Sequence, residues 1–427
     1  MEHPRIYTRQ LGTKREWPHT FRALRHRNYR LLWFGQLVSL VGTWMQSLAQ
    51  QWLVYKLTGQ AFNLGLVSAM MFLPVLILAP FAGVLADRVD KRRLIVATQM
   101  TAMAQAFVLA ALAFSGLIQF WHILAMAAVL GIINAIDMPA RQSFVPEVVE
   151  DHEDLMNAIA LNSMVFNGAR AIGPAVAGIL VGAVGEAWAF TVNGASYLAV
   201  ISGLLLMRMP PREQKEDRTT SAGRDLLDGL RYALSTPAIR TVLTLVMVPS
   251  VFGISYITLL PIFANEVLST QGVPWLEDGA RRLGLLMTAQ GFGALLGALN
   301  IARSGHRRRK GQLLLGGALG FSLMLILFSL SRFFWLSLVL VAVAGFMMIT
   351  FLATANTTLQ STVSSRFRGR VMSFYTMVLV GFGLIGSLLA GAAADWLGAP
   401  LATRIGALIC LAGALIAAQS PLLRRDL

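Results

Sequence analysis

The sequence predicts an all-α membrane protein with twelve transmembrane helices in two pseudo-symmetric six-helix bundles. Its composition, the number of its long apolar segments and an internal repeat support this prediction. Apolar residues make up 56% of the 427 residues and charged residues 13%, against about 45–50% and about 25% in soluble domains. A soluble fold of this length would lack the polar side chains needed to cover its surface.

The apolar segments are long enough for helices that cross a hydrocarbon core about 30 Å thick, whereas barrel strands would be about 10 residues long and alternate in polarity. The expected spans cover residues 30–55, 64–86, 94–115, 120–138, 157–184, 187–207, 238–263, 282–303, 311–331, 334–357, 370–394 and 397–420. The corresponding domains are a tail (1–29), a first bundle (30–207), a linker (208–237), a second bundle (238–420) and a tail (421–427). The first tail has no apolar core, so we expect a solvated tail and not a signal peptide.

Basic residues gather on one side of this topology. If both termini are cytoplasmic, thirty of the 36 lysines and arginines lie on the cytoplasmic side and five outside, with Arg170 inside a span. The positive-inside rule therefore predicts cytoplasmic termini and a multi-pass protein of the cytoplasmic (inner) membrane. We interpret the basic runs as topology signals and lipid contacts, and expect no nucleic-acid partner.

The two halves resemble each other in sequence. Residues 64–66 (Leu-Gly-Leu) recur at 283–285, and the same offset relates Lys91 to Lys310. Residues 142–143 match 360–361 at almost the same offset, and Gly173 and Gly178 match Gly386 and Gly391 at a slightly shorter one. Such a duplication places a cavity between the halves at the middle of the bilayer, and alternating access follows when one half rocks against the other.

Motifs of catalysis and metal binding are missing from the sequence. A single cysteine, Cys410, excludes an internal disulfide and a cysteine metal site, and the six histidines lack metal-ligand spacing. There is no phosphate loop for ATP and no nucleophile elbow. We expect no enzymatic activity, cofactor or metal, so an ion gradient or the gradient of the substrate must drive any transport.

The loop between the second and third spans carries the pattern Gly, apolar, Leu, small, Asp, Arg and further basic residues at 83–93. This loop resembles the signature of the major facilitator superfamily, with Asp90 where that family usually has glycine. The resemblance implies a conformational latch formed by Gly83, Asp87, Arg88 and Arg92. Asp87 would face the start of the eleventh helix near Arg370 and Ser373, where the positive helix end stabilises a carboxylate. The alternative is a surface ion pair.

Three further stretches, residues 42–46, 137–142 and 162–178, resemble the branch of that superfamily which contains enterobactin-type siderophore exporters and macrolide-efflux proteins. Many members of this branch have an acidic residue where this chain has Thr43. The resemblance implies proton antiport. The missing acid weakens the implication that this coupling runs through the first helix.

The fifth span combines small residues, a proline and a charge. Proline kinks a helix and glycines permit close helix contacts, and the packing and kink residues are Gly168, Gly173, Pro174 and Gly178. They resemble the Gly-Pro motif of the exporters, with one extra residue before Gly178, and ordinary tight packing explains them almost equally well. A charge within a span usually faces a cavity or a partner, so we expect Arg170 to line the pathway and pair with Asp137 or an anionic substrate. The alternative is that Arg170 reaches to the membrane interface.

Other polar side chains in or near the spans are further candidates for the transport pathway: Asp137, Arg141, Gln46, Asn162 and Asn167. Asp137 is a candidate proton carrier, and an equally good interpretation is that it caps a helix break at Pro139 and pairs with Arg141. Gln46 could bind substrate or hold helices together, and the second role is commoner.

Together these features predict a monomeric secondary active transporter that exports small amphipathic molecules, drug-like or siderophore-like, in exchange for protons. Its partners would be membrane lipid, the small-molecule substrate and protons. The first alternative is a lysophospholipid flippase or a metabolite uptake system on the same fold. The second is a membrane receptor or assembly partner that transports nothing, although that class usually carries a larger soluble appendage than residues 208–237.

Overall fold

The computed structural model describes residues 19–149, 151–209, 231–270, 272–304, 310–364 and 367–419. Regular secondary structure in these residues is helical, apart from one isolated bridge between Ser269 and Phe333. In an apolar membrane every backbone N–H and C=O must find its partner inside the protein, and a helix provides this within one segment. The all-helical class predicted from the sequence is therefore confirmed.

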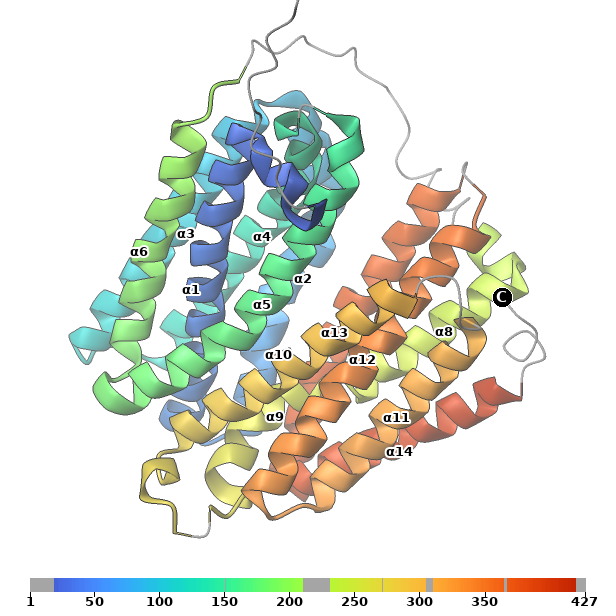
Figure 1. Cartoon of the computed structure of the whole chain (residues 1–427). Helices are drawn as coiled ribbons and strands as arrows, with labels where there is room; N and C mark the ends of the chain where they lie inside the picture. Colours follow the sequence, from blue (N-terminus) through green and yellow to red (C-terminus); the bar gives the residue numbers. More distant parts are fainter. Residues whose placement is uncertain are drawn as a thin grey trace, which may run out of the picture.

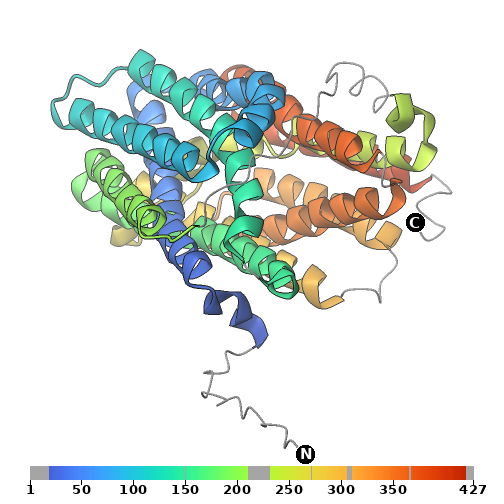
Figure 2. The same cartoon turned by 90° about the horizontal axis from the view of Figure 1, so that it is seen from above.

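The helices form two groups that lie side by side (Figures 1 and 2). The first group contains α1 (Arg27–Thr58), α2 (Ala61–Arg88), α3 (Lys91–Phe114), α4 (Phe120–Val148), α5 (His152–Val184) and α6 (Glu186–Leu205). The second contains α8 (Pro237–Phe252), α9 (Tyr256–Ile262), α10 (Gly279–Ser304), α11 (Lys310–Leu330), α12 (Phe334–Thr362), α13 (Arg368–Leu397) and α14 (Ala399–Ala418).

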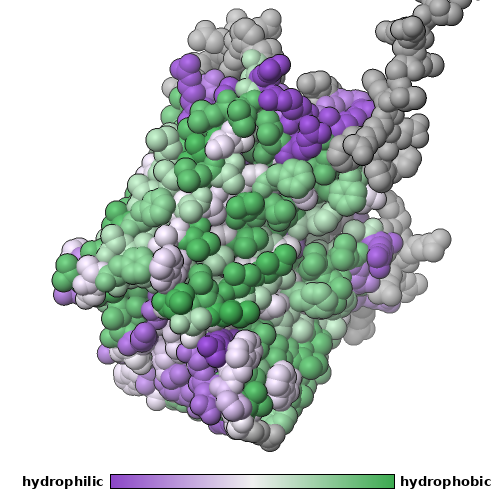
Figure 3. Space-filling model, turned by 60° about the vertical axis from the view of Figure 1, so that its left-hand side comes forward, coloured by the Kyte–Doolittle hydropathy of each residue, from purple (hydrophilic) through white to green (hydrophobic). Residues whose placement is uncertain are grey.

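Eleven helical segments of the described residues are long and apolar enough to cross a membrane, where the sequence predicts twelve spans. The exception is α1, which is 32 residues long but contains many glutamine, serine and threonine residues. The other expected spans each correspond to one of the eleven segments, with ends shifted by up to ten residues. Figure 3 shows a hydrophobic band between hydrophilic residues at both ends of the molecule, as expected for a protein that crosses a membrane.

The predicted span 238–263 is not one continuous helix. It is divided into α8 and α9 at Gly253–Ser255, and a π-helical segment, η2 (Phe263–Val267), follows. The backbone N–H groups of Gly253 and Ile254 both donate to Pro249 O, at 2.8 and 2.7 Å, which widens the turn. The break places Tyr256 at the beginning of α9, in the interior of the protein.

Part of the predicted solvated tail is ordered against the first group, which corrects that expectation. The 3-10 helix η1 (His19–Arg25) lies at the start of α5, where Asp154 is fully buried. The Asp154 carboxylate pairs with Arg22 at 2.9 Å and with Arg25 at 2.7 Å. The remaining tail residues 1–18 and 420–427, and residues 210–230 of the predicted linker, lie outside the described residues.

Turn chemistry explains several helix ends. Asp90, which replaces the usual glycine of the loop signature, is the N-cap of α3 and accepts a hydrogen bond from Arg93 N at 2.8 Å. Gly185 and Gly398, which are equivalent positions in the repeat, both have positive φ, at 92° and 80°. Each joins the two helices on its sides, α5 to α6 and α13 to α14, in a conformation that glycine adopts without a steric penalty.

The predicted internal repeat reappears as repeated contacts. Lys91 Nζ donates to Ser143 O at 3.4 Å, and Lys310 Nζ donates to Ser361 Oγ at 2.9 Å. Gly173 lies against the backbone of α1 at Val41, and Gly386 lies against the backbone of α8 at Val251. Because each pair of contacts joins corresponding helices of the two halves, the duplication is a property of the packing as well as of the sequence.

Candidate functional site

The two groups meet along two seams, α5 against α10 and α2 against α13. In the first, a Cβ added to Gly178 would lie 2.9 Å from Gly284 Cα, so the two backbones touch. In the second, a Cβ added to Gly391 would lie 2.6 Å from Ala61 O. The sequence offsets of the repeat relate these contacts, and the seams are therefore equivalent in the two halves.

Polar contacts join the groups at the end that carries the α1–α2 turn, which we call the closed end. The Asp395 carboxylate of α13 accepts hydrogen bonds from the first two backbone N–H groups of α2, Ala61 N at 2.6 Å and Phe62 N at 2.9 Å. Arg281 of α10 donates to Gly182 O near the end of α5 at 3.2 Å. The Tyr55 hydroxyl of α1 donates to Glu266 at 2.5 Å.

Toward the opposite end, which carries η1 and which we call the tail end, the α5 face of the seam becomes exposed. Ala171 is buried against Gly291 of α10. One turn further, Asn167 is half-buried, and Ser163 after it is exposed. Figure 1 shows the two groups in contact at the lower, closed end and separating toward the top. The face that seals the groups at the closed end is thus open to solvent or solute at the tail end.

Arg170 lies where the contact ends. Its backbone carbonyl touches α10, since a Cβ on Gly291 would be 2.6 Å from Arg170 O. Its guanidinium carbon lies 5.6 Å from the centre of the Trp44 ring of α1, a cation–π distance. Nε is fully buried without a hydrogen-bond partner, although part of the residue remains accessible. The junction of the two groups therefore holds a charge for which no ion pair with a described residue is found.

The second group contributes Tyr256 and Gln290 to the same place. Tyr256, 2% exposed, lies within electrostatic range of Arg170 and next to the Gln290 side chain, which is 4% exposed. The Tyr256 hydroxyl and the Gln290 amide nitrogen nevertheless form no hydrogen bond of normal geometry with any described residue. We call Arg170, Trp44, Tyr256 and Gln290 the Arg170 centre.

The expected pairing of Arg170 with Asp137 is wrong. Asp137 Oδ2 accepts from Arg141, at 2.8 and 2.9 Å, and Oδ1 accepts from Thr98 at 2.6 Å and Gln99 at 3.0 Å. The pairing with Arg141 agrees with one part of the alternative interpretation. Its other part, a helix break at Pro139, is wrong, because α4 continues through Pro139 to Val148. Both carboxylate oxygens of Asp137 are therefore engaged within the first group.

The remaining pathway candidates lie in different surroundings. Gln46 is 2% exposed and bonds to Gln105 of α3 and Asn193 of α6, so it joins three helices of the first group. Asn162 accepts from the Tyr29 hydroxyl at 3.0 Å. Among the described residues, Asn167 donates to Ser163 O of its own helix, and it remains on the open part of the seam. Asn167 is therefore the candidate that shares the interface with Arg170.

The small residues of the fifth span also lie in different surroundings. Gly173 and Gly178 lie at close contacts with α1 and α10, and Pro174 O lies against Gly284. Gly168 has open space where a side chain would be, so it is not required for close packing here. α5 runs as one helix from His152 to Val184 with Pro174 inside it.

The predicted latch lies mostly outside what the structure describes in side-chain detail. Gly83, Asp87 and Arg88 belong to the last part of α2, and the positions of their side chains are not described. Arg92 donates to Leu205 O of α6 at 2.8 Å, within the first group. The latch therefore stays a prediction.

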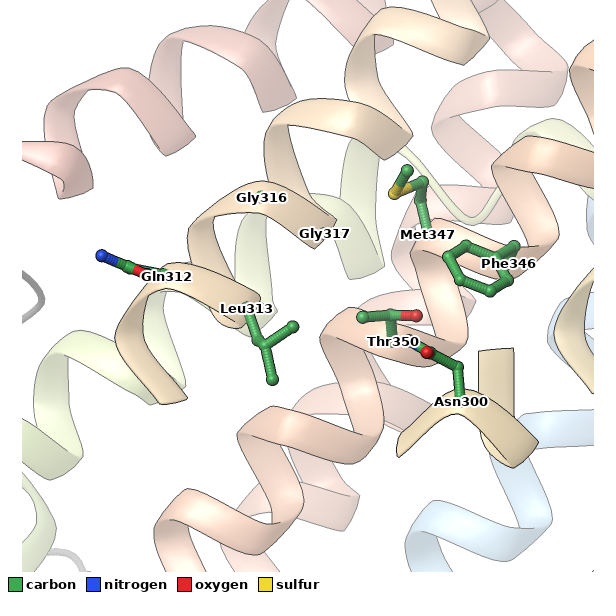
Figure 4. A pocket seen from close by; sticks show the side chains of 8 residues that line it. All are labelled: Asn300, Gln312, Leu313, Gly316, Gly317, Phe346, Met347 and Thr350. Atoms are coloured by element: carbon green, nitrogen blue, oxygen red, sulfur yellow. The ribbon is translucent and has the colours of Figure 1, made fainter. Parts of the chain in front are cut away.

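A pocket of about 280 Å³ lies within the second group, away from the seams (Figure 4). Side chains of α10, α11 and α12 line it, among them Asn300, Leu313, Phe346 and Met347. None of the residues of the Arg170 centre borders it. The pocket is therefore separate from the junction of the two groups. We place the candidate site at that junction, in the Arg170 centre, because residues of both groups meet there.

Sequence reasoning missed Tyr256, Gln290 and the cross-seam contacts of Asp395 and Arg281. The weak signal for Asp395 is the start of α2, which lacks a capping side chain of its own at Gln60. For Gln290 it is the neighbouring Gly291, at a close approach of the two groups. Single polar residues in apolar spans are too common for these signals to stand out.

Known proteins resemble this chain over nearly its whole length. The sequence profile of the family described as "Transmembrane secretion effector" matches residues 19–426. The multidrug efflux pump Tap of Mycolicibacterium fortuitum is 24% identical over 373 residues, 86% of this chain and 88% of that protein. The enterobactin exporter EntS of Shigella flexneri is 24% identical over 86% of this chain and 85% of its own length.

A match to the staphyloferrin A transporter of Staphylococcus aureus has 26% identity and covers 61% of this chain and 63% of that relative. Among solved structures, a bacterial homologue of the human lysosomal transporter Spinster, inward-facing and unoccupied, has a TM-score of 0.72 at 16% identity and covers 94% of this chain and 98% of its own. The nucleoside transporter NupG gives 0.71 at 12% identity, with 92% and 98% covered. These structures show the same fold.

Proposed function

Since the chain belongs to the transmembrane secretion effector family of major facilitator superfamily transporters, we propose that it exports small amphipathic molecules by alternating access. The Arg170 centre is the observation that carries this proposal. It places a partly accessible charge with unsatisfied polar neighbours at the junction of two equivalent halves, the expected place for substrate in such a fold. Efflux and siderophore export are the activities named for the relatives at 24–25% identity.

The proposed topology has twelve spans in two six-helix bundles, residues 30–207 and 238–420, with α1 as the first span. At about 1.5 Å per residue, the 32 residues of α1 exceed the thickness of the hydrocarbon core. The basic residues support cytoplasmic termini and an inner-membrane location. In that orientation the tail end would face the cytoplasm, and the proposed state is open inward and closed outside.

Closure of the tail end and opening of the closed end would carry substrate outward. The seams suit this motion, because glycine contacts between backbones let helices rotate with little interlocking of side chains. Asp395 and Arg281 would stabilise the state that is closed outside. Proton antiport is the proposed coupling, with Asp137 as the candidate proton carrier.

A deletion strain and an overexpressing strain, compared across a panel of amphipathic compounds, test the export proposal. We expect overexpression to raise and deletion to lower the tolerated concentration of at least one compound. The purified protein in vesicles should then move that compound when an inward or outward pH gradient is imposed. Unchanged susceptibility together with transbilayer movement of lysophospholipid in the same vesicles would favour the flippase alternative, and binding without any transport would favour a receptor.

A further inference from the structure

The centre of the α5–α10 seam contains hydrogen-bond donors without acceptors. The buried Arg170 Nε–H finds no acceptor among the described residues, and the Tyr256 hydroxyl and the Gln290 amide, which lie next to each other, make no hydrogen bond of normal geometry there. The Thr288 hydroxyl is also unpartnered, and helical periodicity places it between Gly284 and Gly291, on the side of α10 that contacts α5. Buried polar groups are nearly always hydrogen-bonded in folded proteins, so an unpartnered cluster suggests a ligand.

Carboxylates of the described residues near either seam are engaged elsewhere. Asp137 is bound by Arg141, Thr98 and Gln99 in the first group. Glu266 accepts from Tyr55, and Asp395 caps α2, both at the closed end. These described carboxylates therefore leave the Arg170 centre without an acidic acceptor, which a bound anion would supply.

Aromatic side chains form the apolar side of this centre. The Trp44 ring lies under the Arg170 guanidinium and contacts the Phe166 ring, with centroids 6.0 Å apart. Phe166 is 45% exposed, one turn from Arg170 toward the tail end. A flat apolar body could thus rest on Phe166 and Trp44 while its charged group reaches Arg170. The break between α8 and α9 presents Tyr256 to the same group, as interrupted helices do in other transporter sites.

We propose that the Arg170 centre binds the oxyanion of a small organic acid, so that the exported substrates are amphipathic anions with a carboxylate. A guanidinium with neutral donors around it binds a carboxylate by charge-assisted hydrogen bonds. It disfavours ammonium groups, because they would add a second buried positive charge. Binding of the carboxylate is inferred from the geometry of the centre alone, whereas its export rests on the proposed function.

Binding of three matched fluorescent probes to the full-length protein in nanodiscs of neutral lipid tests the proposal: pyrenebutyrate, pyrenebutanol and pyrenebutylamine. We expect the carboxylate to bind roughly tenfold tighter than the alcohol, since one charge-assisted hydrogen bond contributes on the order of this factor. Arg170→Gln should remove the preference. Equal binding of acid and alcohol, or a preference that survives Arg170→Gln, would overturn it.

Two further variants separate recognition from folding. Tyr256→Phe keeps the ring that packs edge-on against Phe321 and Phe328 and removes one donor, so it should weaken binding of the acid several-fold and leave the alcohol unchanged. Arg404→Gln, on α14 away from the seams, is the matched control and should leave both affinities unchanged. Identical acid affinity in Tyr256→Phe would contradict the assignment of its hydroxyl.

Competition and transport measurements identify the source of the oxyanion. Phosphatidic acid added to the nanodiscs should not displace pyrenebutyrate, and displacement by this lipid alone would assign the centre to a lipid headgroup and overturn the substrate class. If the acid binds through Arg170 but never crosses a vesicle, the binding inference holds and the export proposal fails. If the alcohol and the amine cross independently of Arg170, export holds and this inference fails.

Discussion

The α5–α10 and α2–α13 seams are built from the same repeat, but they differ at the position of Arg170. In both, a glycine of one helix lies against a backbone carbonyl of the other: Gly284 against Pro174 O, and Gly65 against Ser387 O. The offset that relates Pro174 to Ser387 also relates Arg170 to Gly383. In the first seam this position holds a charge, and in the second it is a glycine with open space around it.

The ends of the seams differ as well. Asp395 supplies the negative cap for the N–H groups of α2, whereas at the equivalent place Arg281 supplies donors to the carbonyl of Gly182. Duplication therefore preserved the backbone contacts between the halves, while the side chains diverged. We infer that the α5–α10 seam binds the substrate. The α2–α13 seam would serve mainly as the sliding contact between the halves and as the contact that closes one end.

The largest expected effect comes from filling the backbone contacts. Gly178→Ala and Gly391→Ala place a Cβ 2.9 and 2.6 Å from backbone atoms of the facing helix, which cannot move aside as a side chain can. Overpacking of this kind costs about 1–3 kcal/mol, and we expect both variants to lose most transport and to melt several degrees lower in detergent. Initial transport rates and thermal unfolding of the purified variants measure this.

Gly168→Ala and Gly383→Ala are the controls for these substitutions, one on each seam helix, because neither position has an atom within 4 Å of an added Cβ. They should retain the transport and stability of the parent protein. If Gly178→Ala behaved like Gly168→Ala, the closely packed seam would not be needed for the transport cycle.

An intermediate effect is expected from the caps at the closed end. Asp395→Asn removes a charged acceptor from the α2 N-terminus, which costs about 1 kcal/mol and should increase the fraction of molecules open at this end. In a Cys410→Ser background, a cysteine at Leu64, which is 2% exposed, should then react several-fold faster with a membrane-impermeant maleimide added outside. Arg281→Gln should have a weaker effect, since its bond to Gly182 O is longer, at 3.2 Å. Unchanged labelling in both variants would mean that neither contact stabilises the closed end.

The contrast between the seams also explains what the sequence could reveal. Span positions and the repeat depend on long apolar runs and on glycines at fixed offsets, and these were predictable because each is local. Arg170 was recognisable as a charge inside an apolar span. Tyr256, Gln290 and Asp395 were not, because their importance arises only when segments far apart in the sequence meet, and the pairing of Asp137 with Arg141 within α4 removed the partner expected for Arg170.

At the tail end of the α2–α13 seam, Asp87→Asn tests the latch that the resemblance implies. We expect the variant to insert into the membrane normally and to turn over several-fold more slowly, because the carboxylate no longer stabilises the state closed at this end. Asp90→Asn is the control, since Asp90 caps α3 and an asparagine keeps that cap. A transport rate equal to that of the parent protein in Asp87→Asn would contradict the latch and leave the charge as a surface feature.

The smallest effect is expected at η1, remote from both seams. The Asp151 carboxylate accepts a hydrogen bond from Glu153 N at 3.0 Å, and this is the main reason why the pKa of Asp151 lies below its ordinary value, with Arg25 adding to it. Because the pKa is lowered in the folded protein, the contribution to stability is present above the ordinary pKa of about 4 and is lost as the pH falls through the lower, folded value. The unfolding temperature should therefore fall slightly less between pH 6 and pH 3 in Asp151→Asn than in the parent protein. Transport at neutral pH should be equal in the two proteins. An identical pH dependence in the two proteins would mean that the exposed carboxylate contributes nothing to docking of η1 on α5.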